Sequence, residues 1–247
     1  MYGLGTIVNV IAIIIGGLTG LIGGKLLTKR FQDMITMSCG LATLFLGAGG
    51  ALSKMIIIDS GTLTTLGSLM MIVSLIAGAL IGEALRIEDH LDQFGEWLKE
   101  KSGNGSDNSF VSAFVTASLT VCIGAMAIVG SIEDGIYANH SILFTKAILD
   151  FIIILIMTSS LGRGCIFSAV SVGIFQGLVT AFSRLIQPFM TEPALNNLSF
   201  VGNIMIFSVG LNLMLSVWHP DPSEGRRIRV GNLLPGLVIA VIWALAA

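Results

Sequence analysis

The stretch "TKAILDFIIILI" (Thr145–Ile156) places a lysine and an aspartate four residues apart in an otherwise apolar run. A helix needs about 20 mostly apolar residues to cross the hydrocarbon core of a bilayer, and the run around this pair is long enough to do so. Residues four apart lie on one face of a helix. The sequence therefore predicts a membrane-spanning helix that carries Lys146 and Asp150 together inside the bilayer.

The composition of the whole chain is that of an integral membrane protein. Of its 247 residues, 54% are hydrophobic and 11% are charged, and its mean hydropathy is +0.90, whereas soluble domains carry about 25% charge. No polar segment is long enough to form a soluble core, so we expect one all-α transmembrane domain over residues 1–247. The net charge of -2 and the lack of a long basic stretch argue against nucleic-acid binding.

Eight apolar stretches are long enough, or nearly so, to span a membrane. They are Gly3–Leu27, Met34–Leu52, Thr64–Leu85, Phe110–Ser131, Ile142–Ser160, Cys165–Ile186, Phe200–Val217 and Val230–Ala246. The polar segment 86–109 carries apolar residues at helical spacing, which predicts an amphipathic helix at the membrane interface. Its apolar residues are Leu91, Phe94, Trp97 and Leu98.

The distribution of Lys and Arg predicts the orientation of the eight spans. Ten of these residues fall on one side of the membrane, and only Lys54, Lys146 and Arg184 fall on the other. Because cytoplasmic loops are enriched in Lys and Arg, the side with ten is predicted to be cytoplasmic. Both termini are then outside the cell.

Two pairs of similar segments predict an internal repeat. "LTGLIGGKLL" (Leu18–Leu27) aligns with "IAGALIGEAL" (Ile76–Leu85), and "CGLATLFLG" (Cys39–Gly47) aligns with "CIGAMAIVG" (Cys122–Gly130). We interpret residues 1–53 and 62–132 as parallel copies of one helical hairpin, the second containing the amphipathic segment 86–109, followed by four spans in residues 141–247.

Small residues recur every fourth position on spans one and three, which is typical of close helix packing in membranes. They are Gly16, Gly20 and Gly24 on span one and Ser74, Gly78 and Gly82 on span three. The sequence predicts that these two spans pack on each other.

Asp150 is the most informative residue for function, because it lies roughly 14 Å from the outer end of its span, near the membrane midplane. An ionised carboxylate at that depth costs about 2.5–3.5 kcal/mol or more and must be compensated. Lys146 can supply the compensation in a structural ion pair, or the surroundings can keep Asp150 protonated. The alternative is that both residues belong to a solute or proton path. The candidate solute- or ion-binding residues are Asp150, Lys146, Gln176, Asn212, Asn9 and Thr120.

Two helices also carry small and polar residues at helical spacing, which indicates that these faces point into the bundle. They are Gly173, Gln176, Gly177, Thr180 and Arg184 on span six and Thr116, Thr120, Gly124, Ala127 and Ser131 on span four. Glu133 and Asp134 follow at the predicted outer mouth, where they form either a solvated turn or a group that attracts cations.

No sequence pattern indicates an enzyme, a metal site or a cofactor. Cys39, Cys122 and Cys165 have no C-x-x-C or Cys/His spacing, so we expect buried free thiols. No nucleophile, base and orienting group occur together in a local pattern.

Several motifs resemble a known family. They are "GAMAIVGSIEDG" (Gly124–Gly135), "KAILD" (Lys146–Asp150), "SSLGRGCIFSA" (Ser159–Ala169), "QG" (Gln176–Gly177), "GLNLM" (Gly210–Met214) and "GNLLP" (Gly231–Pro235). The chain resembles the YqgA-like family of bacterial integral membrane proteins, defined by a domain of unknown function. It departs from the pattern at Ala125, where proline is usual, and at Phe151, where glycine is usual. The resemblance implies a bacterial inner-membrane protein and favours a transporter, but supplies no substrate.

The sequence thus favours a transporter or permease for a small solute or ion, with a polar intramembrane site around Asp150. The alternative is a structural or regulatory membrane subunit that binds a partner protein and moves nothing; its polar side chains would all be used in bonds between helices. The lipid bilayer and an unidentified small solute or ion are the expected partners, and a homo-oligomer is left open.

The predicted orientation can be tested by cysteine labelling in a cysteine-free chain. Cysteines introduced at Ser102 and Ser223 are expected to react with a membrane-impermeant maleimide only after the inner face has been opened, because both lie in loops on the cationic side. Labelling of either position from outside in sealed cells contradicts the topology.

Overall fold

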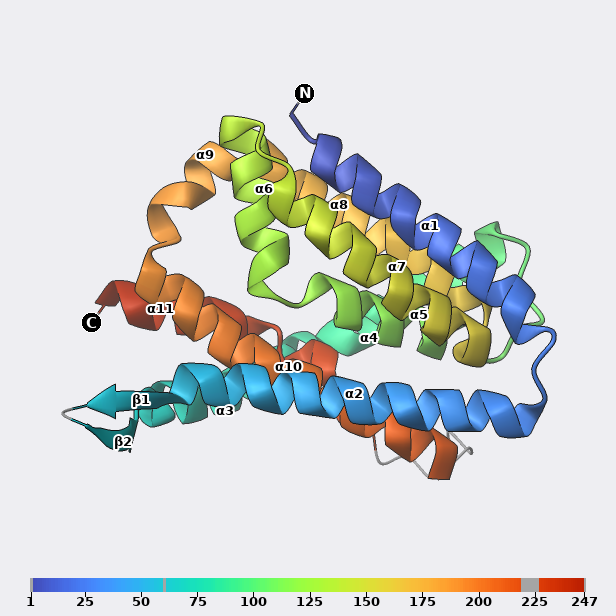
Figure 1. Ribbon diagram of the computed structural model, residues 1–247, viewed down its shortest axis with the longest axis horizontal. Helices are drawn as coiled ribbons and strands as arrows, with labels where there is room; N and C mark the ends of the chain where they lie inside the picture. Colours follow the sequence, from blue (N-terminus) through green and yellow to red (C-terminus); the bar gives the residue numbers. More distant parts are fainter. Residues whose placement is uncertain (1, 60, 219–226, 247) are drawn as a thin grey trace. The chain divides into compact units, whose positions relative to one another are not determined.

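The computed structural model describes residues 2–59, 61–218 and 227–246, and it confirms the all-α transmembrane fold class. Its elements are α1 (Leu4–Gly24), α2 (Lys29–Met55), β1 (Ile56–Asp59), β2 (Thr62–Thr65), α3 (Ser68–Leu85), α4 (Ile87–Lys101), α5 (Phe110–Cys122), α6 (Ala125–Tyr137), α7 (Ser141–Leu161), the 3-10 helix η1 (Arg163–Phe167), α8 (Ser168–Ala181), α9 (Ser183–Ile186), η2 (Gln187–Phe189), α10 (Glu192–Trp218), η4 (Val230–Leu233) and α11 (Pro235–Ala246) (Figure 1).

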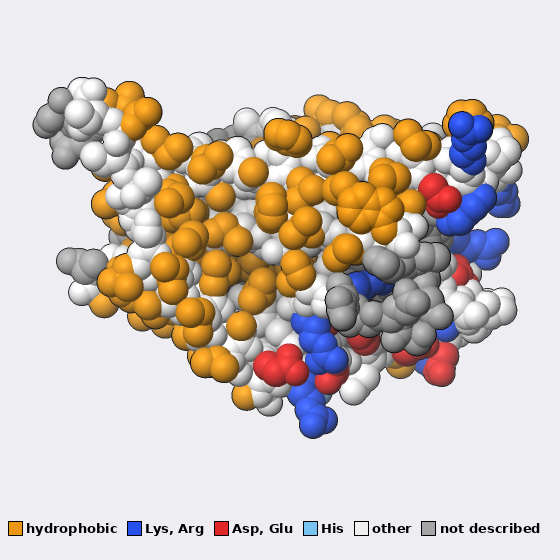
Figure 2. All heavy atoms as spheres, turned by 90° about the horizontal axis from the view of Figure 1, so that it is seen from below, with side chains coloured by type: hydrophobic (Ala, Val, Ile, Leu, Met, Phe, Trp, Pro, Cys, Tyr) orange, Lys and Arg blue, Asp and Glu red, His pale blue; other side chains and the backbone are white. Residues whose placement is uncertain are grey.

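Within the described residues, six helical segments are long and apolar enough to cross a membrane, and α5 with α6 makes a seventh if the bent pair counts as one span. The last predicted span, Val230–Ala246, is a shorter apolar helix. Apolar side chains cover much of the visible surface (Figure 2), as expected where lipid replaces water. A total of eight spans stays a prediction, as does the orientation, and Ser223 and Arg226 lie outside the described residues.

By its internal contacts the chain divides into two compact units. The first comprises residues 1–39, 90–122 and 126–187, and the second comprises residues 40–89, 123–125 and 188–247. The first unit therefore contains α1, α5, α6, α7, η1 and α8, and the second contains α3, α10, η4 and α11. The expectation of one domain over the whole chain stays a prediction.

In the first unit, the glycine face of α1 packs directly on the backbone of α7. A Cβ atom added at Gly16 would lie 2.5 Å from the Phe151 carbonyl oxygen, and one at Gly24 would lie 2.5 Å from the Ser159 carbonyl oxygen. One added at Gly20 would collide with the Leu155 carbonyl. These glycines let the two helices approach until their backbones touch.

In the second unit, the corresponding face of α3 packs on η4 and the start of α11. A Cβ at Gly78 would lie 2.5 Å from the Gly236 nitrogen, and one at Gly82 would overlap the Asn232 carbonyl. The glycines of spans one and three are thus covered by α7 and by η4 with α11, so the prediction that the two spans pack on each other through these glycines is wrong. The small residues do mark close helix contacts, but sequence spacing shows only that a face is small and not which helix covers it.

A β-hairpin interrupts the region predicted as a loop and as the start of span three. β1 and β2 pair antiparallel, with Ile57 opposite Thr64 and Ile58 opposite Leu63. Span three consequently begins at Ser68 and not at Thr64. Six of the eight strand residues are β-branched, which suits extended structure, and the surrounding apolar sequence concealed this signal.

The predicted amphipathic segment forms α4. Leu98 is buried, Gly95 and Phe94 pack on Phe114 of α5, and Trp97 is exposed. Its position at the membrane interface stays a prediction.

The fourth predicted span is broken between α5 and α6. The two helices are bent by 63°, and Gly124 has a φ angle of +149°, a region that favours glycine. Although Ala125 replaces the proline usual in the resembled family, the helix breaks nevertheless, at the neighbouring glycine. The matching segment "CGLATLFLG" continues through α2 without a break, so the proposed repeat of the first two hairpins stays a prediction.

Gly20→Ala is expected to destabilise the protein, because its methyl group has no room beside Leu155 and overpacking typically costs about 1–3 kcal/mol. Gly23→Ala is the matched control on the same helix, since nothing lies within 4 Å of a Cβ there. Thermal unfolding in detergent measures both. An equal or higher melting temperature for Gly20→Ala than for Gly23→Ala would contradict the packing of α1 on α7.

Candidate functional site

Lys146 and Asp150 form a buried ion pair on α7. The Lys146 Nζ atom lies 2.8 Å from Asp150 Oδ1 and 2.6 Å from Oδ2, and the two residues are 7% and 3% exposed. They are one helical turn apart, so α7 alone places them together. The close pair predicted from their spacing is thus present in the structure.

The broken span supplies a third oxygen to the lysine. The Lys146 Nζ atom donates to the carbonyl oxygen of Val121 at 2.7 Å, in the last turn of α5. Carbonyls at the end of a helix have no partner within that helix, and the helix dipole adds negative potential there. The ammonium therefore rests on a carboxylate and on the C-terminal end of a half-helix.

Asn9 of α1 and Gln176 of α8 complete the cluster. The Asn9 Nδ2 atom donates to Asp150 Oδ2 at 3.0 Å and to Gln176 Oε1 at 3.4 Å. Asn9 is fully buried and Gln176 is 1% exposed. Because the ionised carboxylate accepts and does not donate, the nitrogen of Asn9 must face it, which also orients the amide of Gln176. Four predicted site residues, Asn9, Lys146, Asp150 and Gln176, thus meet.

Each amide in the cluster keeps one atom without a partner. Asn9 Oδ1, an acceptor, and Gln176 Nε2, a donor, are buried and bond to no described group. Four further buried side-chain oxygens on the surrounding helices are in the same condition: Thr6 Oγ1, Ser131 Oγ, Thr158 Oγ1 and Thr180 Oγ1. A buried polar atom without a partner costs about 1–3 kcal/mol, so six in one unit require an explanation.

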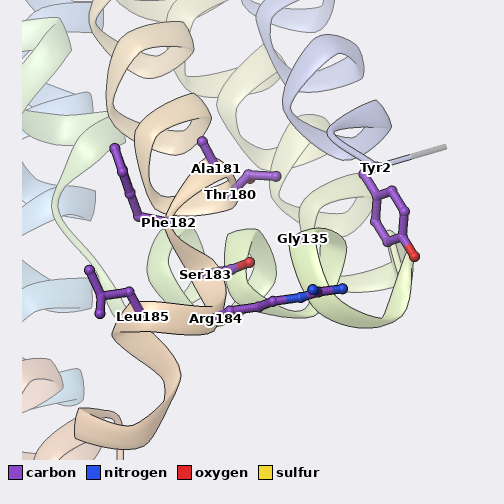
Figure 3. Close-up of a pocket in the computed structure, with 8 residues that line it drawn as sticks. All are labelled: Tyr2, Gly135, Thr180, Ala181, Phe182, Ser183, Arg184 and Leu185. Carbon is purple, nitrogen blue, oxygen red and sulfur yellow. The ribbon is translucent and has the colours of Figure 1, made fainter.

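A pocket of about 370 Å³ opens at one end of the first unit (Figure 3). Its lining residues are Tyr2, Gly135, Thr180, Ala181, Phe182, Ser183, Arg184 and Leu185. Figure 3 shows the side chains of Thr180, Ser183 and Arg184 on the side of Tyr2 and Gly135, whereas Phe182 and Leu185 point the other way.

Three helices lead from this pocket towards the ion pair. One helical turn, about 5.4 Å, separates Thr180 in the pocket from Gln176 on α8, and Gly135 from Ser131 on α6. Tyr2, which precedes α1, lies in the pocket, and Thr6 and Asn9 of α1 follow. Apart from Thr158 Oγ1 on α7, the five remaining unpartnered atoms thus lie on helices that run between the pocket and the cluster.

Asp134 has a different position from the one its sequence suggested. It is fully buried and accepts hydrogen bonds from the Gly3 and Gly5 N–H groups at 3.0 and 2.9 Å, at the N-terminus of α1. Its Oδ1 atom also lies 2.8 Å from His140 Nδ1. The solvated turn considered for Asp134 is therefore corrected to a buried contact that anchors the start of α1.

The two remaining candidate residues make other contacts. Thr120 lies beside Val121, but its hydroxyl donates to the Thr116 carbonyl oxygen at 2.7 Å. Asn212 belongs to the second unit, where its Nδ2 donates to the Ile228 carbonyl oxygen and its Oδ1 accepts from the Ile228 N–H. Both hydrogen-bonding ends of its amide are used, and its place near Asp150 stays a prediction.

The second unit has a polar cluster of its own, built on Asn232. The Asn232 Nδ2 donates to Glu83 Oε2 and its Oδ1 accepts from the Glu88 N–H, while Glu88 Oε2 accepts from the Gly231 N–H. These contacts cap η4. Among the described residues, no group of three His, Cys, Asp or Glu side chains could hold a metal ion.

Comparison of the sequence with known proteins matches the chain to a family whose function is undefined. The family model "Protein of unknown function (DUF554)" matches residues 4–245. The chain is 27% identical to "Uncharacterized membrane protein YdfK" of Bacillus subtilis, covering 95% of this chain and 93% of that protein. It is 24% identical to "Uncharacterized protein YqgA" of Escherichia coli, covering 96% and 94%. No solved structure matches.

Lys146→Met is expected to lower the free energy of unfolding by about 3–5 kcal/mol, because it leaves Asp150 as an uncompensated buried charge. Lys29→Met is the matched control: Lys29 pairs with Asp33 at the same spacing and at 2.8 Å, but its side chain is 81% exposed. Exposed pairs contribute less than about 1 kcal/mol. Denaturant unfolding in detergent compares the two variants, and equal losses would contradict the structural importance of the buried pair.

Proposed function

The chain belongs to the family of proteins of unknown function DUF554, and we propose that it is a permease for a small polar solute or ion. The pocket is the entrance, the faces of α1, α6 and α8 are the route, and the cluster of Asn9, Lys146, Asp150 and Gln176 is the binding site. The protein acts in the bacterial inner membrane, with both termini outside the cell.

The observation that carries this proposal is the set of five unpartnered buried polar atoms between the pocket and the ion pair. In a subunit that only supports the fold, these groups would be bonded to one another across the helices. Here they lie at successive levels below an opening. A solute, or water on its way to the site, would satisfy them in turn.

Asp150 is itself fully bonded, by two contacts from Lys146 and one from Asn9. A solute must therefore displace one of these partners in order to bind there. Lys146 can release the carboxylate and keep its bond to Val121, because that carbonyl accepts its ammonium independently. The cluster can thus have two arrangements, one with the ion pair closed and one with a solute between its members.

The residues of the binding site lie in helices and not in loops. Asn9, Lys146 and Gln176 each lie inside a helix, and α1 is held against α7 by direct backbone contact. Half-helix ends placed at the membrane midplane are a common way to bind solutes and ions in transporters. The end of α5 at Val121 provides such a terminus.

Cysteine accessibility tests whether the route is hydrated without knowledge of the solute. In a cysteine-free chain, Thr180→Cys and Gln176→Cys are expected to react with small polar methanethiosulfonate reagents, because the reactive species is the thiolate, which requires a polar environment. Leu178→Cys is the control on the same helix, since Leu178 is an exposed apolar residue on another face.

Reactivity at positions 176 and 180 with none at 178 supports the permease. If Thr180→Cys and Gln176→Cys both remain as unreactive as Leu178→Cys, the interior is dry and the subunit that binds a partner protein becomes the better interpretation. Thr180→Cys is the milder change of the two, because it retains the size of the native side chain. If Gln176→Cys fails to fold, the reactivity of Thr180→Cys still distinguishes the two interpretations.

A further inference from the structure

We propose that the transported solute is a small monoanion, which enters past Arg184, binds to Lys146 and is accompanied by a proton carried on Asp150. This inference rests on the permease function proposed above and specifies its substrate class. The relevant chemistry is a single negative charge on a carboxylate or on an inorganic oxyanion.

The pocket is lined by one charged side chain, and this side chain is a cation. Arg184 is the only charged residue among those that line the pocket, and no carboxylate in the described part of the chain pairs with it. Glu133 and Asp134 precede Gly135 in the chain but do not line the pocket; Asp134 accepts from the start of α1, and Glu133 Oε2 accepts from Asn139 at 2.7 Å. An anion inside the pocket would therefore meet Arg184 as its charged contact.

The route below the pocket offers hydrogen-bond donors to an anion. Gln176 Nε2 can only donate, and the hydroxyls of Thr6, Ser131 and Thr180 can donate as well as accept. Asn9 Oδ1 is the one unpartnered atom of the five that can only accept. The Lys146 ammonium lies at the end of the route, so an anion that follows these groups can accept a hydrogen bond from four of the five atoms and then from the lysine.

Charge balance in the membrane then requires a proton. The closed pair is neutral, and adding an anion to it would leave one net negative charge near the midplane, which is expensive. If Asp150 takes up a proton from the entering side, Lys146 exchanges its carboxylate partner for the anion, and the site stays neutral. One anion and one proton enter together and leave together, and no other bond is made or broken.

The groups around Asp150 point to it as the proton carrier. Lys146 on α7 and Cys122 on α5 are the titratable groups that interact with it electrostatically, and α1 and α8 contribute the neutral amides of Asn9 and Gln176. The lysine is needed as the cation that holds the anion. Replacing Cys122 by alanine separates the contribution of its thiol from that of Asp150.

Transport by proteoliposomes containing an internal pH dye tests the inference. Sodium nitrate and sodium pyruvate are the probes, since both are fully ionised near neutral pH, and methylammonium chloride is the cationic comparison. With the outside more acidic than the inside, nitrate or pyruvate is expected to acidify the lumen faster than in protein-free liposomes. A response to nitrate alone or to pyruvate alone supports the inference and identifies the inorganic or the carboxylate class.

The variants assign the roles. Arg184→Gln is expected to raise the half-saturating anion concentration about fivefold, the effect of losing one exposed ion pair, and Arg184→Lys is expected to restore it. Lys54→Gln is the control, because Lys54 is predicted on the same side of the membrane but lies outside the pocket and bonds to Asn196. Asp150→Asn is expected to abolish lumen acidification, whereas Cys122→Ala is expected to retain it.

The inference is overturned if neither anion acidifies the lumen, if only methylammonium produces a response, or if Arg184→Gln behaves as the wild type. It is also overturned if Asp150→Asn retains acidification. A reactive cysteine at position 180 combined with any of these results would leave the permease in place and reject only the anion as its solute.

Discussion

The contact of the Lys146 ammonium with Asp150 and Val121 is the interaction on which the first unit depends. A carboxylate and an ammonium in the membrane interior are stable only when each is compensated. Here the compensation comes from two helices: α7 holds both charges one turn apart, and the broken end of α5 offers a carbonyl that no helical N–H group uses. The break at Gly124 and the ion pair are therefore parts of one arrangement, because a continuous helix would have occupied that carbonyl.

Close packing of α1 brings the polar side chains to the ion pair. Gly16, Gly20 and Gly24 allow the backbone of α1 to touch α7, and Asn9 lies about two turns before Gly16 along the same helix. The bulk of Phe151 next to Asp150 is accommodated at this contact, since Gly16 faces its backbone and ring. Asp134 binds the N-terminus of α1. Contacts with neighbouring helices therefore determine both the position of α1 and where its N-terminus lies.

The two units differ in how they use buried polar groups. In the second unit, the side-chain amides of Asn212 and Asn232 form hydrogen bonds with backbone groups and with Glu83, and these contacts hold the ends of helical segments. In the first unit, Asn9 and Gln176 each keep a free amide atom. The asparagines of the second unit thus have both amide ends bonded, whereas Asn9 keeps one unpartnered atom, and the difference lies in which neighbours each amide meets.

The sequence by itself determined the features that depend on local spacing. Apolar length identified the helices, the four-residue interval placed Lys146 beside Asp150, and small residues marked the close faces of α1 and α3. Only the tertiary structure decided which helix covers each glycine face, that Val121 supplies a carbonyl, that Asp134 is buried, and that Asn9 meets Gln176 while Asn212 binds Ile228. No sequence signal indicated that Tyr2 lines the pocket or that the Thr6 hydroxyl is buried without a partner. Residues within one helix have a geometry set by 3.6 residues per turn, whereas contacts between helices depend on how side chains from distant segments fit together.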